Sequence, residues 1–113
     1  MPRTIDSASL NTMFDALQNP YRRRILLAIS DHNPREIKEF TQTKFASVNG
    51  DKADPEQLEV ELHHSHLPKL AEKGYIDWNP EAQTIRRGSN FDDIAPLLKL
   101  MDDHADKLPA DWP

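Results

Sequence analysis

Residues 62–87 read LHHSHLPKLAEKGYIDWNPEAQTIRR, and this stretch decides the fold. Its first half carries leucines at helical spacing and ends at Gly74, the residue type that often follows the last turn of a helix. Its second half holds two short strand candidates, residues 75–78 and 84–87, on either side of the turn-forming sequence Asn-Pro-Glu-Ala. The stretch therefore predicts a helix that leads directly into a β-hairpin.

The helix before the hairpin is expected to run from about Pro55 to Lys73. Pro68 lies inside it. Because proline has no backbone N–H to donate and its ring crowds the preceding turn, we expect a kink or a split there. Upstream, residues 41–56 are polar and contain the turn sequence Asn-Gly-Asp. These residues are expected to form a loop or a partly ordered insert.

Three shorter helical segments precede the insert. The first has apolar residues at the 3–4 spacing of one helical face over residues 10–17. Asn19-Pro20 combines a helix N-cap with the residue favoured at the first helical position, and so opens a second helix. Asn33-Pro34 repeats this signal and opens a short third helix. The expected core residues of the second helix are Ile25, Leu26, Ala28 and Ile29, and the short third helix contains Ile37 and Phe40.

The last expected helix runs from about Asp92 to Asp106, with Pro96 near its first turn. Its apolar residues recur at alternating intervals of three and four, which is the seam of a helix that packs against another helix. Because one small domain has little left to bury against this seam, we expect a homodimer interface made by this helix and the first one. Packing of the seam on the domain's own core is the alternative. The expected interface residues are Leu10, Met13, Phe14, Leu17, Phe91, Ile94, Leu98, Met101 and Ala105.

The order of elements is three helices, an insert, a fourth helix, a hairpin and a last helix. A tri-helical core followed by a hairpin is the winged helix-turn-helix arrangement. The sequence thus predicts a fold that is mostly α with a small β-hairpin, a winged helix-turn-helix with an additional C-terminal dimerisation helix. We expect the DNA-binding domain over residues 1–88 and the dimerisation helix and tail over residues 89–113.

The composition restricts the classes of function. A chain of 113 residues suits one domain, and the absence of cysteine excludes disulfides, thiolate metal sites and thiol redox sensing. With three glycines, no glycine-rich phosphate loop and no nucleophile elbow, the chain is expected to be neither an enzyme nor a cofactor binder. The sequence shows no signal peptide and no run of about 18 apolar residues, so we expect a cytoplasmic protein without membrane contact.

The net charge of −5 taken alone argues against a nucleic-acid binder. The acids, however, are concentrated in residues 51–64 and 89–113, whereas residues 20–50 hold six bases and three acids. An acidic balance also suits a cytosol with a high salt concentration, where charge keeps chains apart. We therefore expect that cations could be bound where such a protein meets DNA.

Two segments resemble a known family. FDALQNPYRRRIL at residues 14–26 resembles the "ALADPTRRRIL" segment of ArsR-like winged helix-turn-helix regulators, and residues 62–76 resemble their recognition helix and its run into the wing. The variant with His-Leu-Pro-Lys-Leu is similar to the small regulators of haloarchaea. The resemblance covers roughly residues 10–88 and implies a homodimeric, sequence-specific transcriptional regulator on double-stranded promoter DNA. The stretch 41–56 departs from it, because the turn between the two helices of the motif is usually tight.

The resemblance also implies which residues contact DNA. A recognition helix over residues 58–73 would lie in the major groove, where exposed side chains reach base edges. Arginines at the end of the wing would contact phosphate or a narrow minor groove. For any single histidine of the helix, inward packing is the alternative, and for the wing arginines it is a pair with Asp77 or Glu81. The expected contacts are His63, His64, Ser65, Lys69, Arg86, Arg87, Arg35 and Lys38.

Other functions stay open at this point. The domain could serve as a protein-interaction module that docks a partner on its acidic surface. A metal-responsive repressor has weak support from Asp102-x-His104 and from the histidines at 63 and 66, and no metal site is predicted from them. The run Arg22-Arg23-Arg24 points in different directions on a helix and is not assigned as a site.

Overall fold

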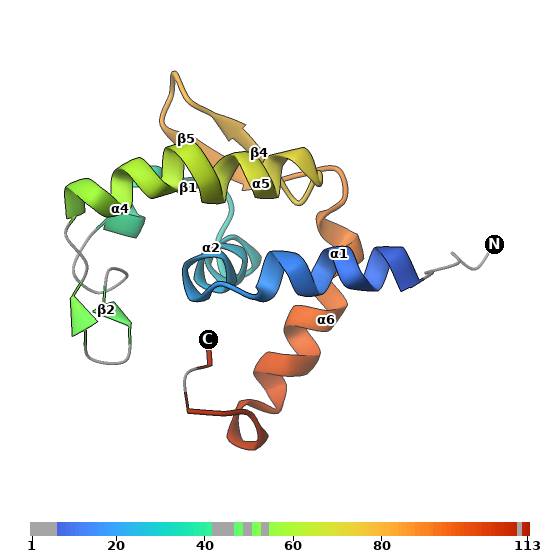
Figure 1. Ribbon diagram of the computed structural model, residues 1–113. Helices are drawn as coiled ribbons and strands as arrows, with labels where there is room; N and C mark the ends of the chain where they lie inside the picture. Colours follow the sequence, from blue (N-terminus) through green and yellow to red (C-terminus); the bar gives the residue numbers. More distant parts are fainter. Residues whose placement is uncertain (1–6, 42–46, 49–50, 53–54, 111) are drawn as a thin grey trace.

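The computed structural model describes residues 7–41, 47–48, 51–52, 55–110 and 112–113. These residues form a mostly helical domain with a small three-stranded antiparallel sheet (Figure 1). The α-helices are α1 (Ser7–Leu17), α2 (Pro20–Asp31), α4 (Pro55–Glu61), α5 (Leu67–Glu72) and α6 (Phe91–Asp103). The shorter helices are η1 (Ile37–Thr41), η2 (Leu62–His66) and η3 (Ala105–Lys107). The strands are β1 (Arg35–Glu36), β2 (Ser47–Val48), β3 (Asp51–Lys52), β4 (Ile76–Asn79) and β5 (Thr84–Arg87).

Helix α2 begins as the sequence predicts. The side chain of Asn19 accepts a hydrogen bond from the backbone N–H of Tyr21 at 2.8 Å, and Pro20 takes the first helical position. Asn33-Pro34 does not start an α-helix. Residues 35–36 instead pair with residues 84–85 as a third strand, and the Asn33 side chain accepts from the N–H of Arg87. The 3-10 helix η1 follows, and tertiary pairing thus overrides the local signal.

Helices α4, η2 and α5 follow one another without a break and form one rod across the upper part of Figure 1, below the tip of the hairpin. The backbone stays helical through both junctions, with φ and ψ of −63° and −39° at Glu61 and of −68° and −46° at Leu67. Between them η2 is a π-helix, in which the Leu67 N–H donates to the Leu62 carbonyl five residues back. The disruption expected from Pro68 therefore takes the form of a wider turn, and the rod neither breaks nor ends there.

The hairpin after the rod is confirmed. Strands β4 and β5 pair antiparallel with Trp78 opposite Ile85, and β1 adds to the outer side of β5. Gly74 has a φ of 79°, the left-handed conformation that glycine adopts without strain. A Cβ there would also lie 2.6 Å from the Asn90 amide nitrogen, so glycine is required between rod and hairpin.

The region predicted as an insert, residues 41–56, lies partly outside the described residues. Its described part contains the two-residue strands β2 and β3, which pair antiparallel with Ser47 opposite Lys52. Thr41 ends η1, and residues 55–56 already belong to α4.

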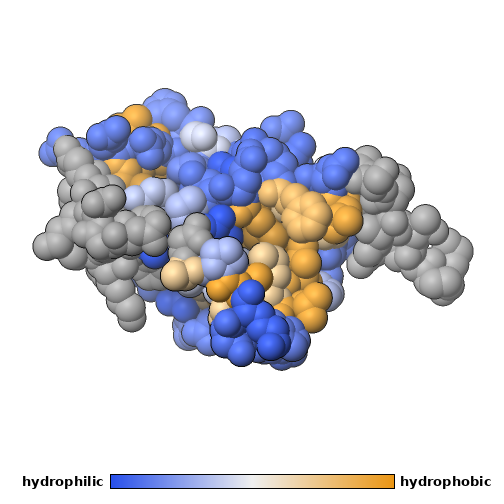
Figure 2. Space-filling view, turned by 60° about the horizontal axis from the view of Figure 1, so that its bottom comes forward, coloured by the Kyte–Doolittle hydropathy of each residue, from blue (hydrophilic) through white to orange (hydrophobic). Residues whose placement is uncertain are grey.

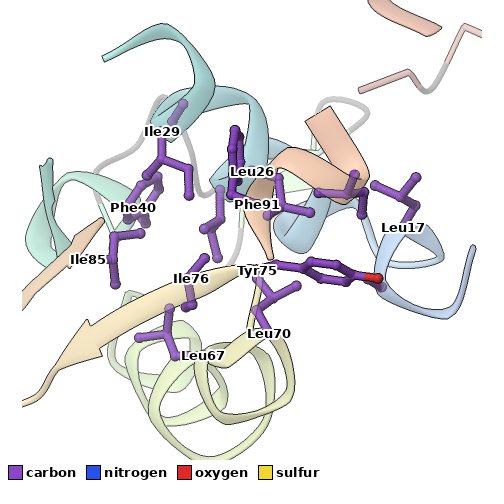
Figure 3. Close-up of a cluster of buried hydrophobic side chains, with 14 of the residues drawn as sticks. Leu17, Leu26, Ile29, Phe40, Leu67, Leu70, Tyr75, Ile76, Ile85 and Phe91 are labelled. Atoms are coloured by element: carbon purple, nitrogen blue, oxygen red, sulfur yellow. The ribbon is translucent and has the colours of Figure 1, made fainter. Parts of the chain in front are cut away.

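The core lies where α1, α2, the rod, the sheet and α6 meet (Figure 3). It includes the core residues predicted for the second helix, together with Ile37 and Phe40 of η1. It also includes five of the nine residues predicted for a dimer interface. Those five are at most 5% exposed, so their side chains offer no surface to a second copy, and the alternative of packing on the domain's own core holds for them: Met13, Leu17, Phe91, Ile94 and Leu98.

None of the helices in the described part of the chain is long and apolar enough to cross a membrane.

Candidate nucleic-acid interface

His64 and Ser65 are the most available of the predicted base contacts. Both are exposed on the π-helical turn of the rod, and neither has a hydrogen-bond or ion-pair partner among the described residues. An imidazole offers both a donor and an acceptor, and a serine hydroxyl does the same. Two adjacent, unpaired side chains of this kind can therefore bond to an outside partner without first breaking an internal contact.

His63 and His66, on the same turn, are engaged within the domain. The His63 ring lies edge-on to Trp78 of β4 with 5.8 Å between centroids, and its Nδ1 is 2.8 Å from the Glu59 carbonyl. His66 is buried, with Nδ1 3.3 Å from a guanidinium nitrogen of Arg22. The inward packing that was the alternative for a single histidine is thus found for His66. Burial, and next the charge of Arg22, lower the pKa of His66.

Lys69, predicted to bind phosphate, is paired inside the domain. Its ammonium lies 2.9 Å from the Asp15 carboxylate of α1, and the two side chains are 35% and 40% exposed. The hydrogen bond from Lys69 lowers the pKa of Asp15, against a smaller opposing effect of desolvation. Lys69 would have to leave Asp15, or be shared with it, to bind a phosphate.

The two arginines at the end of β5 point to opposite faces, as strand geometry requires. Arg86 is exposed and has no partner among the described residues. Arg87 donates to the carbonyls of Ile29 and Ser30 at 2.9 and 2.8 Å and stacks over Phe91. Arg87 therefore holds the hairpin to the C-terminal end of α2, and Arg86 alone is free to contact a partner.

Arg35 has the same structural role as Arg87. Its Nε donates to the carbonyls of Ala28 and His32, and its guanidinium pairs with Glu39 at 3.2 Å and Asp31 at 3.5 Å. The last carbonyls of a helix have no partner within the helix, so the two arginines supply donors at this end of α2, where the Ala28 carbonyl also accepts from the backbone N–H of His32 at 2.9 Å. The predicted phosphate contact by Arg35 would break this set. Acids four residues before and after Arg35 were a visible signal of that pairing.

Lys38 remains at the surface and pairs with Glu36 at 3.2 Å, with side chains 76% and 59% exposed. A pair this exposed contributes little to stability and exchanges readily with other partners. Lys38 is therefore still available to a phosphate.

Two arginines to which the sequence analysis assigned no role bind backbone carbonyls at the end of α1. Arg22 is buried and donates to the carbonyls of Ala16 and Asp15 at 2.9 and 3.0 Å, while Arg23 donates to that of Leu17 at 2.7 Å. Both close the C-terminal end of α1 and fix it against α2. Two of the three arginines of the basic run therefore have structural roles.

Acidic residues remain the electrostatic obstacle to DNA. Glu56, Glu59 and Glu61 are exposed on α4, immediately before the turn that carries His64 and Ser65. Among the described residues no group of three or more histidines and acids lies close enough to hold a metal ion.

Comparison with known proteins gives one match. The DUF7344 family, described as a domain of unknown function, matches residues 14–86, from the middle of α1 to the penultimate residue of β5. No curated protein and no solved structure was found to match the chain.

Proposed function

The chain belongs to the DUF7344 family, a domain of unknown function, and we propose that it is a sequence-specific, DNA-binding transcriptional regulator of the winged helix-turn-helix type that acts as a homodimer. In this proposal the rod of α4, η2 and α5 is the recognition helix, and the hairpin of β4 and β5 is the wing. The order of elements and the likeness of residues 14–26 and 62–76 to ArsR-like regulators support it.

One observation carries the proposal. His64, Ser65 and Arg86 are exposed, have no partner among the described residues, and come from the rod and the hairpin that directly follows it (Figure 1). A histidine and a serine on a helix suit base edges in the major groove, and an arginine on an adjoining hairpin suits the backbone or the minor groove.

The dimer of this proposal uses the apolar surface that α1 and α6 leave uncovered. Figure 2 shows hydrophobic side chains gathered on the face of these two helices. Leu10, Phe14 and Leu100 are 41%, 50% and 58% exposed, and Leu97 and Met101 are partly buried beside them. Exposed apolar surface of this kind marks interaction sites in soluble proteins. A two-fold dimer would present two rods to successive major grooves, about 34 Å apart.

The test is genome-wide crosslinking and pull-down of the tagged chain in its own cells. We expect discrete promoter peaks that share an inverted-repeat motif. The double variant His64→Ala/Ser65→Ala should lose the peaks, because it removes the base contacts and leaves the core intact. Lys107→Ala, on exposed η3, is the matched surface control and should keep them. Enrichment no greater than that of an untagged strain would contradict the proposal.

A second function is favoured by one specific feature. Val60 is 57% exposed on α4 among the exposed acids Glu56, Glu59 and Glu61. An apolar residue surrounded by carboxylates suits a basic protein partner. Co-purification of one protein, lost on Val60→Asp and without promoter peaks, would establish this docking function in place of the first.

A further inference from the structure

Lys69 of the rod, which the proposed function assigns to a phosphate contact, forms an ion pair with Asp15 of α1. Lys69 Nζ lies 2.9 Å from Asp15 Oδ2, and both side chains are more than a third exposed. The pair is therefore within reach of a third charged group at the surface. A lysine side chain can exchange partners by rotating about its flexible stem, without any movement of α5.

Asp15 is held in place from several sides. Its Oδ1 accepts a hydrogen bond from the Gln18 side chain at 2.9 Å. Besides Lys69, the charges of Arg22 and Lys73 also favour its ionised form and lower its pKa. Arg22 is buried, whereas Lys69 on the rod and Lys73, the residue that follows its last turn, are half-exposed. Asp15 thus neutralises a small basic group that would otherwise face solvent beside the candidate interface.

We propose that Asp15 is an internal competitor for the DNA backbone, and that it lowers the affinity of this protein for duplex DNA by holding Lys69. The inference rests on the proposed function. When Lys69 moves to a phosphate, Asp15 loses its partner next to a polyanion and recruits a cation from solution. That cation offsets the counterion released from the DNA, so the contact yields little net release.

The test measures binding of a short fluorescein-labelled duplex of unrelated sequence by fluorescence anisotropy over a series of KCl concentrations. Such binding reports backbone contacts without base readout. Asp15→Asn should bind about two- to fivefold more tightly than wild type, as expected for release of a surface ion pair. The slope of log K against log salt should steepen by about 0.9, the value of one phosphate contact on B-DNA.

Two controls separate this effect from a change of net charge. Asp106→Asn makes the same charge change on exposed η3, at the end of α6 away from the rod (Figure 1), and should leave affinity within the error of wild type. In the Lys69→Gln background, Asp15→Asn should have no effect, because the residue acts through Lys69. Asp15→Gln is the second neutral variant should Asp15→Asn lose its helical circular dichroism.

The outcomes distinguish the two proposals. Wild-type protein that leaves the duplex free at the lowest salt concentration contradicts the DNA-binding function and this inference together. Wild-type protein that binds, with Asp15→Asn equal to it or with a gain that persists without Lys69, overturns the role of Asp15 alone.

Discussion

At the scale of single residues, the domain places one titratable group where its ionised form is disfavoured. His66 is buried at the π-helical turn, against Arg22 and with the Tyr21 ring 6.0 Å away between centroids. Glu61 opposes the effect weakly, and burial and Arg22 lower the pKa of His66 below its usual value. Folding therefore keeps this imidazole neutral over a pH range in which the unfolded chain takes up a proton.

This gives a prediction of stability against pH. Above about pH 6.5 His66 is neutral in both the folded and the unfolded chain and contributes no pH dependence. As the pH falls below that value, the unfolded chain binds a proton that the folded domain does not, so the free energy of unfolding decreases until the folded pKa is reached. Each unit by which the pKa is lowered corresponds to about 1.4 kcal/mol.

Urea unfolding between pH 7.5 and 5 measures this loss of stability. His66→Gln should flatten the profile, and His104→Gln, at an exposed site, should not. Equal profiles for wild type and His66→Gln would refute this account.

At the scale of elements, the three-stranded sheet is attached to α2 by arginines as well as by apolar packing. Arg35 of β1 and Arg87 of β5 take four carbonyls at the C-terminal end of α2. The neighbouring Arg86 points away and takes none. Under the proposed function, the two adjacent arginines of this strand would have separate tasks: Arg87 stabilises the domain and Arg86 contacts DNA.

A matched pair of variants tests this division. Arg87→Ala should lower the free energy of unfolding by about 1 kcal/mol, because two carbonyls lose charged donors. Arg86→Ala should leave stability unchanged and weaken duplex binding severalfold by removing a cation from the wing. Thermal unfolding and fluorescence anisotropy on both variants decide the matter. The reverse assignment of the two effects would mean that Arg87 is the partner contact.

At the scale of the whole molecule, local sequence signals predict the individual helices and strands better than they predict which of these elements pack together. Asn19-Pro20, Gly74 and the hairpin act within a few residues, and all three are as expected. The pairing of β1 with β5 joins residues some fifty positions apart through a strand, β1, of only two residues, and no local pattern predicts it. The site residues divide in the same way. Exposure of His64 follows from the helix, whereas the partners of Arg35, Lys69 and Arg87 depend on tertiary packing.

The apolar seam of α6 shows most clearly what the spacing of residues leaves undecided. Intervals of three and four describe a helix face that is buried, and they do not say whether the same chain or a second copy buries it. Phe91, Ile94 and Leu98 close the domain's own core. Beside that seam, Leu97 is partly buried against the core and Leu100 is exposed. A helix of this kind is apolar on a wider arc than one core requires, and the excess is the surface that the proposed dimer would use.

The choice of variants for the dimer follows from this distinction. Leu98→Glu would bury a charge in the core, so loss of the folded state would say nothing about association. Phe14→Glu and Leu100→Glu change exposed positions on α1 and α6. Together they should yield a folded monomer by circular dichroism and analytical ultracentrifugation, whereas the wild type sediments as a dimer. The same double variant should bind an inverted-repeat operator much more weakly than the wild type, because one rod reaches only one half-site.

A monomeric wild type would contradict the proposed dimer, and a double variant that remains dimeric would place the association surface elsewhere. Since the two substitutions leave His64, Ser65 and Arg86 untouched, affinity for a single half-site should stay the same, which separates loss of the dimer from loss of the DNA-reading surface.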